Sequence, residues 1–289
     1  MTHSERSDSG PAAGERRSGR ASCLRRLAPA LAAGVLCATA AFARAAPASA
    51  AEALRAHEIT YHTAFKGIGA GDLQLTLRPD GAPDRWSYET RPFPSVLARL
   101  VVSADSRERS VFLLKPDGVE PQHYLIDGGG DRSKRTELKY DWVRGRVTGT
   151  SRGTALDLAI KPGTQDTMSI RIAVVADLLA GREPNEYAML DGDEVKHYVY
   201  HRAGTAHLKT ALGELDTVIF TSERKGSDGR DRTWQYWYAP SLGWLPVRIE
   251  QRQDGAARLT FIVHSFKWLP PSGPTTPAAP AESGATPPR

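Results

Sequence analysis

The chain has 289 residues, of which 40% are hydrophobic and 25% are charged, and its formal net charge is +5. Residues 1–50 hold seven of the 38 Lys and Arg but only three of the 33 Asp and Glu, so the rest of the chain is nearly neutral. The high isoelectric point is therefore no argument for a nucleic-acid partner, and we expect none.

The first fifty residues have the three parts of a cleavable export signal. Arginines in 16–26 precede an apolar run of 15 residues, 27–41, and Ala48-Ser49-Ala50 fits a cleavage site. The apolar run is too short to cross a bilayer, so we expect no stable membrane span. We predict cleavage at the end of this site, with Ala46 as the alternative, and a protein that is periplasmic or secreted.

The rest of the chain divides into one folded domain and a tail. Both cysteines, Cys23 and Cys37, lie in the export segment, so we expect a domain without disulfides that depends on its hydrophobic core. Residues 270–289 contain seven prolines and no large apolar residue, a composition that predicts a disordered tail. Residues 51–269 are long enough for a single β-rich domain.

Hydrophobic residues recur at every second position through most of this domain, which is typical of β-strands. Leu73, Leu75 and Leu77, for example, share one face of a strand. Turn sequences such as 67–71 and Asp254-Gly255 separate the runs at short intervals, and this spacing indicates hairpins. We predict a mainly β fold, in which a curved antiparallel sheet forms an open or closed β-barrel.

One helix is predicted among the strands, at about residues 167–180. Its apolar side chains fall on a single stripe, made of Met168, Ile172, Val175 and Leu179. We therefore expect an amphipathic helix that packs against the sheet. The segment 95–102 favours a second, short helix.

Aromatic residues gather late in the chain. On a strand, Trp234, Tyr236 and Tyr238 share one face, and Trp237 points to the other. Two interpretations stay open: these rings pack in the core, or they line a pocket for an apolar or sugar-like ligand.

Asp141 and Asp166 are candidates for a polar site, since two carboxylates can share acid–base work. The alternatives are a turn residue at Asp141 and a helix cap at Asp166.

His197 and His201 would lie about 13 Å apart on a strand, too far for one metal ion. No cofactor motif occurs, so we predict no catalytic residues, no metal and no cofactor, and we leave open whether the protein is an enzyme.

The order of six motifs resembles that of DUF3108, an exported bacterial family of unknown function. The resemblance covers residues 54–267 and implies a β-rich, secreted or periplasmic protein of Gram-negative bacteria, without an activity or catalytic residues. The motifs are Gly67-Ile68-x-Ala70-Gly71, Gly118-x-x-Pro121-x-x-Tyr124, Tyr140-Asp141-Trp142, Pro162-Gly163-Thr164-Gln165-Asp166, Gly213-x-Leu215-x-Thr217, and Trp237-x-Ala239-Pro240 with Leu245-Pro246-Val247-Arg248-Ile249.

Three functions compete at this point. The first is a periplasmic module that binds or carries an apolar ligand from the cell envelope, such as a lipid. The second is an envelope scaffolding or interaction protein whose helix fills the barrel. The third is a hydrolase that acts on envelope lipid or glycan through Asp141 and Asp166. The oligomeric state stays open.

Overall fold

The computed structural model describes residues 54–82, 84–130, 133, 135–224 and 232–270. These residues all belong to one compact unit, Ala46–Arg289. The predicted export signal lies outside the described residues, as does the predicted tail after its first residue.

Fourteen strands of the described residues form one antiparallel sheet, as the alternating sequence predicts. Most neighbours in the sheet are also neighbours in the chain, because short turns join them. The strands are β1 His57–Phe65, β2 Ile68–Pro79, β3 Arg85–Pro94, β4 Arg107–Lys115, β5 Gly118–Asp127, β6 Thr136–Asp141, β7 Arg146–Ser151, β8 Thr154–Ala159, β9 Glu186–Asp191, β10 Glu194–Thr210, β11 Gly213–Arg224, β12 Thr233–Ala239, β13 Leu245–Gln253 and β14 Ala256–Trp268.

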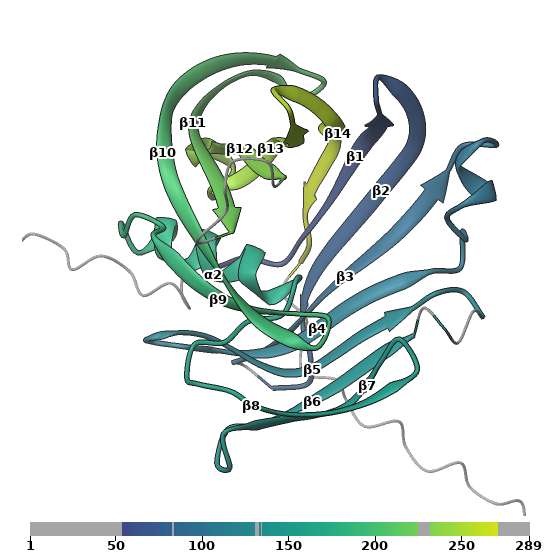
Figure 1. Cartoon of the computed structure of the whole chain (residues 1–289). Coiled ribbons are helices and arrows are strands. Elements are labelled where there is room, and N and C mark those ends of the chain that lie inside the picture. The colour runs from purple at the N-terminus through teal and green to yellow at the C-terminus, as the bar shows by residue number, and fades with distance from the viewer. Residues whose placement is uncertain (1–53, 83, 131–132, 134, 225–231, 271–289) are drawn as a thin grey trace, which may run out of the picture. The chain divides into compact units, whose positions relative to one another are not determined.

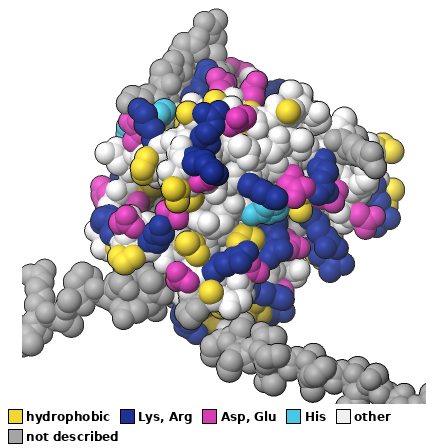
Figure 2. Space-filling model, turned by 90° about the horizontal axis from the view of Figure 1, so that it is seen from below, with side chains coloured by type: hydrophobic (Ala, Val, Ile, Leu, Met, Phe, Trp, Pro, Cys, Tyr) yellow, Lys and Arg dark blue, Asp and Glu magenta, His cyan; other side chains and the backbone are white. Residues whose placement is uncertain are grey.

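Two meanders make up the sheet, and β1 pairs with β14 where they join. The sheet curves strongly, but β8 and β9 are its two edges and do not pair with each other (Figure 1). Of the two predicted forms, the barrel is therefore the open one. Seen from below, the outer surface carries charged side chains of both signs, with hydrophobic ones mostly scattered between them (Figure 2).

The chain crosses from β8 to β9 through the helix α2, Ser169–Leu179, which lies within the curve of the sheet. Ile172 and Val175 of the predicted stripe are buried, and so are Ile170 and Val174. The helix is thus apolar on more sides than the single predicted stripe, because the curved sheet surrounds it. Among the described residues, no helix is long and apolar enough to cross a membrane.

The segment before α2 covers the β9 edge of the sheet. The Gln165 backbone pairs with β9 through two hydrogen bonds of 2.8 Å. The Gln165 N–H donates to the Ala188 oxygen, and the Leu190 N–H donates to the Gln165 oxygen. The Gln165 side chain donates to the Val119 oxygen in β5 at 2.8 Å. This segment therefore connects two distant strands across the interior and satisfies backbone groups of an edge strand.

The turns that join β1–β2, β3–β4, β5–β6, β7–β8, β9–β10 and β13–β14 all lie at one end of the strands, because every pair is antiparallel. We call this the turn end. The α2 segment enters and leaves the sheet at the opposite end.

Candidate functional site

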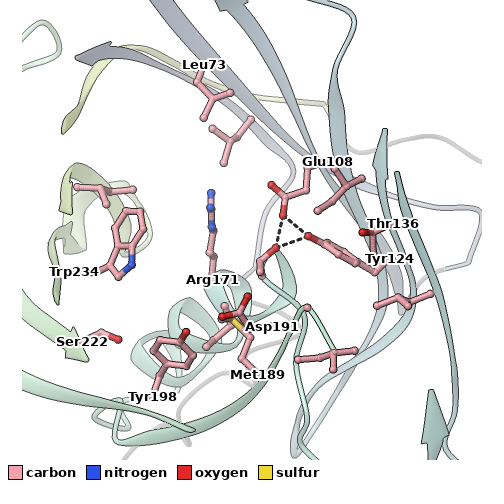
Figure 3. A pocket seen from close by; sticks show the side chains of 18 of the residues that line it. Leu73, Glu108, Tyr124, Thr136, Arg171, Met189, Asp191, Tyr198, Ser222 and Trp234 are labelled. Atoms are coloured by element: carbon pink, nitrogen blue, oxygen red, sulfur yellow. Dashed lines mark hydrogen bonds between the residues drawn. The ribbon is translucent and has the colours of Figure 1, made fainter. Parts of the chain in front are cut away.

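A cavity of about 360 Å³ lies between the concave face of the sheet and α2 (Figure 3). Leu75, Leu138 and Ile249 contribute to its apolar wall, and Ile170 of the helix lies beneath. The cavity exists because the sheet is too wide for one short helix to fill its curve. Its volume lies within the usual range of small-molecule sites, about 300–1,000 Å³.

The cavity reaches the turn end of the sheet. Arg152 at the β7–β8 turn and Gly192 at the β9–β10 turn both line it. The helix occupies the other side, so a ligand would enter from the turn end.

Aromatic side chains cover much of the wall on the side of β10 to β14. Trp234 and Tyr236 lie nearly parallel, with ring centres 6.3 Å apart. Tyr200 stacks on Tyr236 at 6.0 Å, and Phe261 also lines the cavity. Such rings present a large apolar surface with a polar atom at the tyrosine tip, which suits an amphipathic ligand.

Arg171 extends from α2 into the cavity, with its guanidinium between Trp234 and Glu108 (Figure 3). Within the described residues its side chain has no hydrogen bond and no ion pair. Burial would lower the pKa of Arg171, but Glu108 and three nearby tyrosines outweigh burial and raise it. The group is therefore a charged side chain that faces the cavity without a direct partner.

Glu108 of β4 faces Arg171 from the opposite wall, and its position is fixed by neighbours (Figure 3). Its Oε1 accepts hydrogen bonds from the Tyr124 hydroxyl at 2.6 Å and from the Thr167 hydroxyl. These bonds connect β4, β5 and the start of the helix. One carboxylate oxygen is therefore occupied by donors from the protein itself.

Asp166 is buried at the start of the helix and has a full set of donors. Its Oδ1 accepts from the N–H groups of Met168 at 2.9 Å and Ser169 at 2.7 Å, and its Oδ2 accepts from the Ser110 hydroxyl at 2.6 Å. Its own N–H donates to the Ser169 hydroxyl at 2.9 Å, so the two residues cap the helix reciprocally. Burial raises the pKa of Asp166 to about 6.

The structure separates the predicted aromatic residues. Trp234 and Tyr236 line the cavity. Tyr238 is buried beside Tyr236, at 5.8 Å between ring centres, and does not line it. Trp237 points to the other face of the sheet, where the Arg248 guanidinium lies 5.0 Å from its ring centre.

The two predicted carboxylates make separate contacts. Asp141 lies at the end of β6 and accepts from the Arg144 N–H at 2.9 Å and from its guanidinium at 3.0 Å. Asp166 contacts Ser110 and the helix start instead. In the part of the chain that the structure covers, no three His, Cys, Asp or Glu side chains are grouped to hold a metal ion.

Arg171 and Glu108, which face each other across the cavity, are not predicted from the sequence. One signal was available for Arg171, because it is a lone cation within the apolar helical run 168–179. Glu108 gave no comparable signal, since it lies among polar residues, between Arg107 and Arg109, as many exposed strand residues do.

A family model described as "Protein of unknown function (DUF3108)" matches residues 58–262. The chain belongs to this family. The resemblance predicted from the motif order is thereby confirmed, and the DUF3108 description assigns no activity. No curated protein matches the chain.

A solved structure shares the β-barrel-like fold of this DUF3108 chain. A β-barrel-like DUF1849 protein from Brucella abortus aligns with a TM-score of 0.50 and 11% identity, over 75% of this chain and 99% of that one. MucB of Pseudomonas aeruginosa, in its complex with MucA, aligns with a TM-score of 0.37 and 11% identity, over 77% and 55%. The identity to the DUF1849 protein is low, so that likeness concerns the fold alone.

Proposed function

We propose that this protein binds an amphipathic molecule of the cell envelope, such as a fatty acid or another acidic lipid, in the cavity above α2. One observation carries the proposal: the charged Arg171 side chain faces an apolar and aromatic cavity without a direct partner. An acidic group of a ligand would give this guanidinium a charged hydrogen-bond partner inside a largely apolar cavity, where such a bond is strong.

The walls of the cavity suit an apolar portion of the ligand. Leu75, Leu138 and Ile249 offer apolar contacts, and the stacked Trp234 and Tyr236 add a flat aromatic surface. A hydrocarbon portion would bury its surface there, while its acidic end meets Arg171. The predicted export signal supports a periplasmic site of action, where envelope lipids are the available amphipathic molecules.

The other two functions have less support. A scaffold whose helix fills the barrel would leave no cavity of this size. A hydrolase that uses Asp141 and Asp166 would need the two carboxylates to share a site, and they contact different groups.

Direct binding of a matched ligand pair tests the proposal. We expect the purified protein to bind dodecanoate at least tenfold more tightly than its uncharged methyl ester, measured by isothermal titration calorimetry. Arg171→Met should remove most of this preference, because only the acid uses the guanidinium. Arg144→Met, at an exposed arginine in the β6–β7 turn, at the opposite end of the strands from the turn end, is the matched control and should keep it.

Native mass spectrometry of protein from the periplasm, followed by lipid extraction, gives a second readout. We expect a co-purified acidic lipid in wild type and less of it in Arg171→Met. Clean protein without ligand, together with no preference for the acid, would overturn the proposal.

A further inference from the structure

The exposed large hydrophobic side chains are concentrated at one place. The described residues contain ten of them, and eight lie in two segments, 65–68 and 93–102. Val96, Leu100 and Val101 are 82%, 83% and 75% exposed. Elsewhere, as on the face in Figure 2, hydrophobic side chains are mostly scattered. A contiguous group of exposed hydrophobic side chains on a protein surface is typical of an interaction site.

The two segments form one surface, which we call the apolar tip. The Ser95 N–H donates to the Ala70 oxygen at 2.9 Å, and the Ser95 hydroxyl donates to the Gly69 oxygen at 3.3 Å. Gly71 allows this close approach: a Cβ there would lie 2.2 Å from the Phe93 oxygen. The tip is therefore a built feature in which the start of β2 supports the β3–β4 connection.

Residues 95–102 do not form the predicted short helix. They make one 3-10 turn, η1 Ala98–Leu100, and none of its residues is buried. A helix would bury one face against the sheet, whereas this turn extends its apolar side chains into solvent. Hydration of these side chains is unfavourable, so a site that removes them from water is expected.

Three cations surround the apolar tip: Lys66, Arg91 and Arg99. Within the described residues none of them forms an ion pair. The Lys66 amine lies 5.6 Å from the Phe65 ring centre, and the Arg91 guanidinium lies 5.3 Å from that of Phe93. Long basic side chains beside apolar ones suit the boundary of a bilayer, where the charge meets lipid phosphates and the apolar part enters the acyl region.

Acidic groups near the tip do not cancel this charge. Asp72 contacts His62 at 2.5 Å, and Asp105 lies after the apolar run. The local excess is therefore positive although the chain outside its first fifty residues is nearly neutral. Polybasic and apolar groups act together in binding to anionic lipid.

We propose that the apolar tip docks this protein on the surface of a bilayer that contains anionic phospholipid. The tip lies at the turn end, which the cavity also reaches. Docking would therefore place the cavity entrance beside the lipid. This last step rests on the proposed function, whereas docking itself does not.

Vesicle co-sedimentation tests the docking. The probe is a vesicle of phosphatidylethanolamine and phosphatidylglycerol at three to one, compared with phosphatidylcholine alone. We expect wild type to bind the anionic vesicles at least tenfold more tightly, and less so as salt is raised. Leu97→Asp with Val101→Asp should reduce binding to the anionic vesicles more than tenfold.

The matched control is Val143→Asp, at a valine that is 98% exposed on the β6–β7 turn, at the other end of the strands. It should bind like wild type, and all variants should keep their melting temperature because the altered side chains are exposed. Arg171→Met should dock normally, so loss of ligand and loss of docking are separable. Failure of wild type to bind anionic vesicles, or equal binding by the tip variant, would overturn the inference.

Discussion

Asp166 and Arg171 are charged residues five positions apart in the segment that crosses the interior, and the fold treats them differently. Asp166 has donors from Met168, Ser169 and Ser110, all within 2.9 Å. Arg171 has no direct partner among the described residues and faces the cavity. A buried carboxylate that accepts several hydrogen bonds supports the structure, whereas a partly buried cation on the wall of a cavity, without a direct partner, is available to a ligand.

A third charge, placed where there is neither a donor nor a cavity, should have the largest effect. Val175 is buried on α2, so Val175→Asp would put an unpaired carboxylate in the core. We expect a loss of about 3–5 kcal/mol in the free energy of unfolding, measured with urea. Val175→Ala is the control and should lose much less. Similar stability of the Asp variant and wild type would mean that this face of the helix is accessible to water.

Replacement of Asp166, whose carboxylate accepts several hydrogen bonds, should give the second largest loss of stability. Asp166→Ala leaves two helix N–H groups and the Ser110 hydroxyl without their acceptor. We expect a loss of about 2–4 kcal/mol in urea unfolding, from the lost cap and the unsatisfied donors. Asp166→Asn keeps an acceptor for the N–H groups and should lose less. If both variants were equally unstable, an acceptor for the helix N–H groups would not explain the effect, and the role of Asp166 as a cap would be contradicted.

The pH dependence of stability isolates the charge of Asp166. Its pKa is about 6 in the folded state and 3.8 as the ordinary value, so the folded state holds the proton more tightly. This contribution therefore stabilises the fold at low pH and is lost as pH rises from about 4 to 6, by about 2–3 kcal/mol. Urea unfolding at pH 4.5 and 7 measures it. Asp166→Asn should remove that part of the slope, and an unchanged slope would contradict the assignment.

Much of the fold follows from the sequence, because local patterns determine it. The alternation of Leu73, Leu75 and Leu77 predicts a strand, and the apolar run near Val175 predicts the helix. Trp234 and Tyr236, which the alternation places on one face, both line the cavity. Each of these features depends on residues a few positions apart.

The charged pair across the cavity could not be predicted in this way. Glu108 and Arg171 lie 63 positions apart, and only the curve of the whole sheet brings them to opposite walls. Whether the barrel is open or closed could not be predicted either, because it depends on whether the edge strands β8 and β9 meet in space. The helix predicted at 95–102 is wrong: only the short turn η1 forms there, and none of its residues is buried, so no packing stabilises a longer helix.

The smallest expected effect on stability is that of Arg171→Met. This variant tests whether Arg171, unlike Asp166, contributes nothing to the stability of the fold. Arg171→Met keeps the length of the side chain and removes a charge that has no direct partner. We expect the free energy of unfolding to stay equal or to rise by about 1 kcal/mol, whereas preference for the acid over its ester is lost. A loss as large as that of Asp166→Ala would show that Arg171 supports the fold as Asp166 does. In that case Glu108 would be its partner in solution, and the charge would no longer identify a binding site.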